Sequence, residues 1–349
     1  MERAGKLMRT NFMNKKLSIA WLQYLGLITV ILLIIFLTHA VFGNVLTAAN
    51  MRVMAMNMVF EAIMALGMTF VIILGGIDLS VASVFAFAEI LVAKLMMEAG
   101  LPVPLAVIIT IVACCGIGMI NGFMIVAFRV HPMVITLGTL LTLRGINLAI
   151  TDGRSISGFS DGFHWLGQGK IFGIDFPIVF FVVVAAILGF LLAHHKYFRQ
   201  IYFIGGSERS ARFSGVSISR VKISIYALCA TLAGCAGVMA AAKYGAAHWG
   251  HGNMAELKAI GSVAIGGADM MGGSGTIFGT VLGAMFLAVV HNAFVTSAVN
   301  PFWYDIVNGA MLLIAVLISR FIAKQNDRKM KSVRQQKIEQ SLQNQKSVT

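Results

Sequence analysis

Residues 19–42 read IAWLQYLGLITVILLIIFLTHAVF, an apolar stretch without Lys, Arg, Asp or Glu. The hydrocarbon core of a bilayer is about 30 Å thick and an α-helix rises about 1.5 Å per residue, so one crossing needs roughly 20 such residues. The stretch exceeds the about 7–15 residues of a signal-peptide core, and no clear Ala-x-Ala cleavage site follows it. We therefore expect a first transmembrane helix that the mature protein retains.

Comparable stretches recur along the chain. The 349 residues are 58% hydrophobic and 12% charged, with a mean hydropathy of +0.85, whereas soluble domains carry about 25% charged residues. The apolar segments span residues 19–42, 53–74, 79–97, 103–128, 130–150, 177–194, 223–242, 258–268, 276–295 and 304–321. The sequence therefore predicts an all-α polytopic membrane protein with about ten transmembrane helices over residues 19–321. The short eighth segment runs into a glycine-rich stretch, which predicts a broken or re-entrant helix near 258–275.

The basic residues gather in three places, which are the N-terminal tail (1–18), the loop 195–222 and the C-terminal tail (322–349). Short cytoplasmic loops of membrane proteins collect Lys and Arg. Both termini and the loop are therefore expected in the cytoplasm, and ten crossings satisfy all three positions. The net charge of +13 does not follow one amphipathic face, so we expect no nucleic-acid partner.

A weak internal repeat relates VIILGGIDLS (71–80) to SVAIGGADMM (262–271). When the two segments are aligned at their ends, the Gly-Gly pair of one matches the Gly-Gly pair of the other, and Asp78 matches Asp269. Many transporter folds contain such repeats. A parallel duplication and a chance similarity of glycine-rich helix ends both explain the match. Asp78 itself is expected to cap the N-terminus of the third segment.

Polar and ionisable side chains inside apolar segments are costly and often functional. The candidates are Asn57, Glu61, Glu89, Arg144 and His291. One interpretation is a translocation path in which a polar stripe through Asn57 and Glu61 faces the protein interior. The other is an internal ion pair, for instance between Arg144 and either Glu61 or Glu89, that fixes helix packing.

Glycines at intervals of four let membrane helices approach closely. This spacing occurs at Gly118 and Gly122 and again at Gly275, Gly279 and Gly283, so we expect these glycines to serve helix packing. The run 272–279 lacks the lysine of a phosphate-binding loop. HExxH and metal-ligand spacings are also absent from the sequence. We therefore expect no catalytic residues, no metal site and no cofactor bound by this chain.

The polar loop contains YFIGGSERSARFSGV (202–216), and two other motifs are GGIDLSVAS (75–83) and AIGSVAIGGADMMGGSGTIFGTVLGA (259–284). Together these motifs resemble the ribose-type (ribose, xylose and autoinducer-2-like) permease family of ATP-binding-cassette (ABC) importers. The resemblance covers nearly the whole chain, and the motifs keep their order and spacing. Ser210 replaces the usual alanine and Ala82 the usual glycine, and both replacements are small.

The resemblance implies a permease subunit in the bacterial inner membrane, in contact with lipid, that translocates a sugar or sugar-like solute. Its implied partners are a second permease copy or paralogue, a periplasmic sugar-binding protein, and an ABC ATPase subunit that binds ATP and Mg and hydrolyses the ATP. The loop would couple to the ATPase through a short helix. The candidate coupling residues are Glu208, Arg209, Ser210, Ala211, Arg212, Phe213, Ser214 and Gly215.

A second function stays open from the residues alone. Glu61, Glu89 and His291 would suit a secondary transporter of a small polar solute driven by an ion gradient. Such a transporter would need no ATPase partner, and an uncoupler would abolish its uptake. The three motifs favour the ABC importer.

Overall fold

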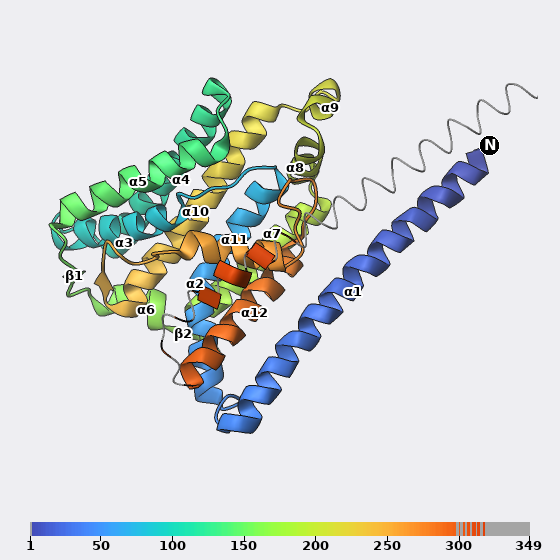
Figure 1. Ribbon diagram of the computed structural model, residues 1–349. Coiled ribbons are helices and arrows are strands. Elements are labelled where there is room, and N and C mark those ends of the chain that lie inside the picture. The colour runs from blue at the N-terminus through green and yellow to red at the C-terminus, as the bar shows by residue number, and fades with distance from the viewer. Residues whose placement is uncertain are drawn as a thin grey trace, which may run out of the picture.

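The chain is described by a computed structural model over residues 2–297, residue 300 and single positions between 303 and 317, with side chains from residue 21 onward. This part of the chain is almost wholly helical (Figure 1). Its helices are α1 (Glu2–Phe42), α2 (Ala48–Ile73), α3 (Val81–Met97), α4 (Val103–Phe128), α5 (Pro132–Thr151), α6 (Asp161–Gln168), α7 (Phe176–His194), α8 (Lys196–Gly206), α9 (Glu208–Phe213), α10 (Ile218–Tyr244), α11 (Ala255–Ile265) and α12 (Ile277–Thr296). Four two-residue strands are β1 (Ile156–Ser157), β2 (Lys170–Ile171), β3 (Ile174–Asp175) and β4 (Ala246–Ala247).

Seven helices of the described part are long and apolar enough to cross a membrane. They are α1, over Trp21–Phe42, and α2, α4, α5, α7, α10 and α12. The predicted helical membrane protein is confirmed, but the structure does not confirm ten crossings. The third and eighth predicted segments form helices of 17 and 11 residues, α3 and α11, which are shorter than the roughly 20 residues a full crossing needs. The tenth segment, 304–321, falls largely outside the described residues.

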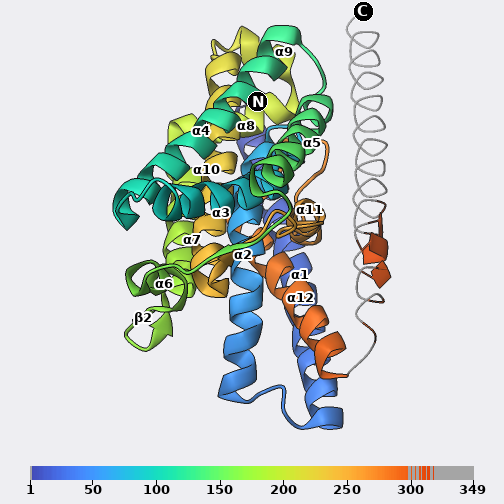
Figure 2. The same ribbon diagram turned by 90° about the vertical axis from the view of Figure 1, so that its left-hand side faces the viewer.

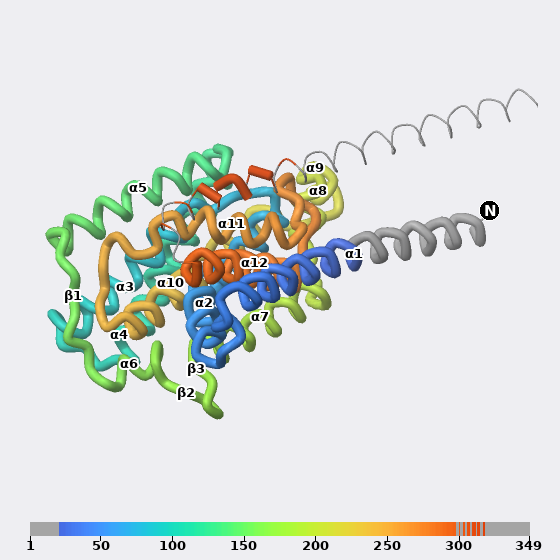
Figure 3. Tube along the Cα trace, turned by 60° about the horizontal axis from the view of Figure 1, so that its bottom comes forward, coloured from blue at the N-terminus to red at the C-terminus, as the bar shows by residue number. Residues whose placement is uncertain are grey.

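The centre of the bundle is formed by α2, α3 and α10. The most apolar windows of α2 and α10 are 83% and 72% buried, whereas those of α1, α4, α5 and α7 are only 11–28% buried. Apolar side chains therefore cover the outside of the bundle, as expected where the surrounding medium is lipid. Figure 3 shows α1 running alongside α12, and the Tyr24 hydroxyl lies 2.8 Å from the Thr276 Oγ1 atom.

The connecting segments gather at the two ends of the bundle (Figure 2). At one end, β1 pairs antiparallel with β4, which ties the connection between α5 and α6 to the connection between α10 and α11. The β2–β3 hairpin and α6 lie at this end too, while α8 and α9 lie at the other. The loop 195–222 is thus folded into two helices, with α9 over Glu208–Phe213.

The two similar motifs form similar turns where α2 and α11 end. In each turn a glycine takes a positive φ of 88°, Gly75 after α2 and Gly267 after α11. After α2, Leu74 donates its N–H to the Phe70 carbonyl, Gly75 to the Ile72 carbonyl and Gly76 to the Val71 carbonyl. The same three spacings occur after α11, where the donors are Gly266, Gly267 and Ala268. The turns thus pair Gly75 with Gly267, one residue from the predicted pairing with Gly266, whereas the aspartates Asp78 and Asp269 keep the predicted offset.

The aspartates of the two motifs also behave alike. Asp78 Oδ1 accepts the N–H of Ser80 at 2.9 Å, and Asp269 Oδ1 accepts the N–H of Met271 at 2.9 Å, so each carboxylate closes a turn two residues ahead. The predicted capping role of Asp78 needs correction, since the N-cap residue of α3 is Ser80. Asp78 Oδ1 instead accepts hydrogen bonds from both the N–H and the hydroxyl of Ser80, and the Ser80 Oγ atom lies 2.6 Å from Oδ1.

Candidate permeation pocket and coupling helix

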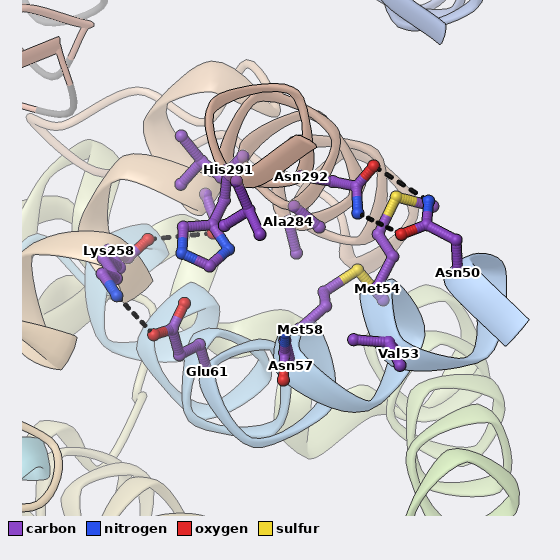
Figure 4. A pocket seen from close by; sticks show the side chains of 14 residues that line it. Asn50, Val53, Met54, Asn57, Met58, Glu61, Lys258, Ala284, His291 and Asn292 are labelled. Carbon is purple, nitrogen blue, oxygen red and sulfur yellow. Dashed lines mark hydrogen bonds and ion pairs between the residues drawn. The ribbon is translucent and has the colours of Figure 1, made fainter. Parts of the chain in front are cut away.

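A polar pocket lies between α2, α11 and α12 (Figure 4). Three of the predicted residues, Asn57, Glu61 and His291, line it, together with Lys258, Asn50 and Asn292. Asn57 and Glu61 lie one turn apart on α2, so they share a face. The polar stripe predicted on this helix therefore faces a pocket.

Glu61 is paired with a lysine that the sequence analysis did not single out. The Lys258 Nζ atom lies 2.7 Å from Glu61 Oε1, and the two side chains are 19% and 31% exposed. This ion pair links α2 to α11. Lys258 opens the eighth apolar segment, and a cation at that position was the signal that could have identified the partner.

A pair of amides closes the far end of the pocket. Asn50 donates to Asn292 Oδ1 at 3.1 Å, and Asn292 donates to Asn50 Oδ1 at 3.0 Å. The two exchanged hydrogen bonds join the start of α2 to α12. The pocket therefore has an ion pair near one end and an amide pair near the other, with methionine side chains between them (Figure 4).

Glu89 and Arg144 lie outside this pocket. Glu89 on α3 is fully buried, and its Oε2 atom accepts the N–H of His248 at 3.3 Å and lies 2.7 Å from His251 Nδ1. Arg144 on α5 interacts electrostatically with Glu256. The suggested ion pair between Arg144 and Glu61 or Glu89 is therefore wrong in its partners, because the segment after β4 folds back and supplies His251 to the buried Glu89.

The His251–Glu89 contact predicts a pH-dependent stability. The Glu89 carboxylate accepts the hydrogen bond and raises the pKa of His251 above its ordinary value, and the rings of Tyr244 and His248 lie 5.3 and 5.4 Å from the His251 ring. A raised pKa in the folded state adds stability below the unfolded value of about 6.5, and this stability is lost as the pH rises through the folded value. We expect the unfolding temperature in detergent to fall as the pH rises through this window.

Glu89→Gln is the control for that measurement, because it keeps the shape of the side chain and removes its charge. The variant should be less stable at low pH and should show a flatter pH profile than the unmodified protein. Equal slopes in the two proteins would show that the His251–Glu89 contact does not cause the pH dependence.

Four of the predicted packing glycines, Gly118, Gly122, Gly279 and Gly283, lie on helices where they approach other segments closely, whereas Gly275 lies in the connection before α12 and not on a helix. A Cβ atom on Gly122 would lie 2.6 Å from Ile223 Cα, and one on Gly118 would lie 2.7 Å from the Ala230 Cβ and against the Tyr226 carbonyl. A Cβ on Gly279 or Gly283 would meet the backbone of α11 or the turn after it, and one on Gly275 would lie 2.9 Å from the Ala268 and Ile73 side chains.

The helix α9 presents an exposed basic and aromatic face. Arg212 and Phe213 are strongly exposed, at 73% for the Arg212 side chain and 81% for Phe213, and the Arg209 guanidinium lies 6.0 Å from the centre of the Phe213 ring. Ala211, on the opposite side, is buried. Glu208 anchors the helix to α10 through Lys222, whose Nζ lies 2.8 Å away.

The ends of this helix follow from the sequence. Ser207 accepts the N–H of Ser210 at 3.2 Å and caps the start. Gly215 then takes a positive φ of 77°, a conformation that favours glycine, where the chain turns toward α10. Ser214 lies between them as the C-terminal cap.

Apolar helices long enough to cross a membrane surround a polar, half-buried pocket, an arrangement typical of membrane transport proteins. Residues 50–316 match the family described as branched-chain amino acid transport system / permease component. The chain belongs to this family and is a permease subunit, not an enzyme. The resemblance to ribose-type permeases is confirmed by this match together with individual relatives named as ribose and allose permeases.

Individual relatives cover most of the chain. The ribose import permease protein RbsC of Bacillus subtilis is 34% identical over 299 residues, which are 85% of this chain and 91% of that protein. The D-allose transport system permease protein AlsC of Escherichia coli is 33% identical over 82% of this chain and 89% of its own length. The galactose/methyl galactoside import permease protein MglC of Salmonella typhimurium is 31% identical over 88% and 96%. No solved structure matches the chain.

Proposed function

We propose that this chain is the transmembrane permease subunit of an ABC importer for a sugar or sugar-like solute. The observation that carries the proposal is that relatives covering most of the chain are named as permeases for ribose, D-allose and galactose or methyl galactoside. ATP and Mg bind to a separate ATPase subunit, and a periplasmic binding protein delivers the solute.

The solute path follows the pocket between α2, α11 and α12. Asn57, Glu61 and His291 line it, and amide, carboxylate and imidazole groups exchange hydrogen bonds with hydroxyl groups. Glu89 and Arg144 serve the packing of α3 and α5 instead. The Glu61–Lys258 pair is therefore both an internal ion pair and part of the wall of the path.

The chain crosses the bacterial inner membrane ten times, with both tails (1–18 and 322–349) in the cytoplasm. In this topology α3 and α11 are too short to span the membrane by themselves, and each completes its crossing with the non-helical segments beside it. The end of the bundle with α8 and α9 faces the cytoplasm, and the end with β1 and β4 faces the binding protein. A second permease, identical or related, completes the path.

The helix α9 docks on the ATPase. Its exposed Arg209, Arg212 and Phe213 offer multidentate donors and an apolar anchor to an acidic partner surface, while Ala211 and Glu208 hold the helix to the bundle.

Arg212→Glu tests this docking. The variant should insert and fold normally, because the Arg212 side chain is 73% exposed and its pairing distance to Glu208 is 3.7 Å. Its association with the ATPase and its ATP-driven uptake should be lost, since the change places a negative charge in the docking face. Lys196→Glu, an exposed position at the start of α8, makes the same charge change outside this face and is the control. Normal uptake by Arg212→Glu would contradict the proposed docking surface.

Reconstitution tests the proposed function as a whole. The chain is co-expressed with the ATPase and the binding protein of its host, purified in mild detergent and placed in liposomes, and uptake of radiolabelled ribose, allose and galactose is followed. We expect the ATPase to co-purify and uptake of at least one sugar to require ATP. Uptake that needs no ATPase and collapses with an uncoupler would instead establish a secondary transporter.

A further inference from the structure

Three segments meet in backbone contact where α2, α8 and α11 end. They are the turn after α2 (73–76), the last residues of α8 (Gly205–Gly206) and the connection from α11 to α12 (266–276). A Cβ atom on Gly272 would lie 2.8 Å from Gly75 Cα and 3.1 Å from Gly205 Cα. No side chain therefore fits between these backbones. We name this contact the glycine junction.

Hydrogen bonds hold the glycine junction together. The N–H of Gly273 donates to the Ile73 carbonyl at 2.8 Å, which joins the α11–α12 connection to the end of α2. The Tyr202 hydroxyl donates to the Gly275 carbonyl at 2.8 Å, which joins α8 to the same connection. The ring of Phe198 packs edge-on against that of Phe70, with 5.6 Å between their centroids. Each of the three segments is thus bonded or packed to the other two.

The position of the glycine junction relates the pocket to the exposed helix α9. The helices that line the pocket are α2, α11 and α12, and all three reach the glycine junction with one end. On the other side, α8 ends at Gly206, and only Ser207 separates it from α9. A displacement of α9 therefore reaches the pocket helices through contacts between backbones, which cannot absorb it by changing side-chain rotamers.

We propose that the glycine junction transmits the movement of α9 to α2, α11 and α12, with Gly205 and Tyr202 as positioning residues for transport. The turn at Gly75 lies in this contact, so the end of α2 moves with α8. This inference rests on the proposed ABC import function, and it concerns how ATP hydrolysis and uptake are coupled.

Neighbouring glycines supply a matched test. A Cβ on Gly205 would clash with the Ile73 carbonyl and the Gly273 amide, whereas a Cβ on Gly206 would have no heavy atom within 4 Å. Both residues lie in α8, where alanine suits the backbone. Gly205→Ala should therefore open the glycine junction, and Gly206→Ala should leave it closed.

The readout is the number of solute molecules imported per ATP hydrolysed, measured on the complex of permease, ATPase and binding protein in liposomes. We expect Gly205→Ala to assemble and hydrolyse ATP but to lower this ratio about tenfold, within the range of usual coupling effects between sites. Gly206→Ala should keep the normal ratio. Tyr202→Phe, which removes only the hydrogen bond to Gly275, should fold normally and lower the ratio in the same direction by a smaller factor.

The outcomes separate the two proposals. If the unmodified complex shows no ATP-dependent uptake, the proposed function fails. If the unmodified complex transports and both Gly205→Ala and Tyr202→Phe keep the normal ratio, the glycine junction does not transmit the movement. Should Gly205→Ala fail to assemble, the ratio for Tyr202→Phe decides alone.

Discussion

Replacing Gly118 by leucine should prevent the bundle from assembling, whereas the same replacement at Gly116, on the same helix, should be tolerated. Gly118 is buried where α4 crosses α10, and a Cβ there would lie 2.7 Å from the Ala230 Cβ and 2.8 Å from the Ala227 Cα. Gly116 has no heavy atom within 4 Å of its Cβ position. The two variants therefore differ in packing while the change in helix propensity is the same.

The size of the effect follows from what the added side chain meets. Overfilling a well-packed core costs about 1–3 kcal/mol when neighbouring side chains can adjust. Here the neighbour is the backbone of α10, a helix buried over 72% of its most apolar window, so we expect a cost above that range. A protein with about 5–15 kcal/mol of stability loses much of it.

Yield and monodispersity in mild detergent, followed by thermal unfolding, measure the outcome. Gly118→Leu should give aggregated or degraded protein, Gly118→Ala a folded protein with a lowered unfolding temperature, and Gly116→Leu a profile like that of the unmodified chain. Equal behaviour of Gly116→Leu and Gly118→Leu would show that the α4–α10 approach does not limit folding.

The sequence was sufficient for the helices because transmembrane segments depend on a local property. Eight of the ten predicted apolar segments coincide with helices to within five residues, and the first lies inside the longer α1. The tenth, 304–321, falls largely outside the described residues. The helix α9 falls inside the predicted coupling loop. The predicted segment 79–97 ends at the same residue as α3, but α3 begins only at Val81, which leaves 17 residues. Its start could not be read from hydropathy, because Leu79 is as apolar as the helix that follows.

The partners of the buried charges could not be predicted, because they depend on which segments fold back. His251 lies in a connection between helices, yet it contacts Glu89, which is 162 positions away in the chain. Lys258 pairs with Glu61 across 197 positions. Spacing along one helix identified Asn57 and Glu61 as a shared face, but the opposite wall of the pocket belongs to α11 and α12.

Two ion pairs on α2 provide the second large prediction. Glu61 pairs with Lys258 inside the pocket, and Arg52 pairs with Asp175 outside it through two hydrogen bonds of 2.6 Å. We expect the double variant with Glu61→Gln and Lys258→Gln to take up solute at least about tenfold more slowly than the unmodified protein. This factor corresponds to a free-energy difference of roughly 1.4 kcal/mol. The double variant with Arg52→Gln and Asp175→Asn is the control and should take up solute at the normal rate. Both double variants preserve the net charge and remove one ion pair that α2 makes with another segment.

The single variants separate the contribution to folding from the contribution to transport. Removing one partner of a buried pair costs about 3–5 kcal/mol because the other charge stays unpaired. Glu61 and Lys258 keep some contact with solvent, at 31% and 19% exposure, so Lys258→Gln alone should cost less than that but more than the double variant. Thermal unfolding of the unmodified protein, the two single variants and the double variant measures how strongly Glu61 and Lys258 stabilise each other.

Uptake then distinguishes a wall of the path from a structural pair. If Glu61 and Lys258 only fix the packing of α2 on α11, the double variant, once folded, should import the sugar as the Arg52–Asp175 control does. If they contact the solute, uptake falls although the protein is folded and its ATPase still associates. We expect the second result, because the pair lies in the pocket beside Asn57 and His291 rather than in the apolar centre of the bundle.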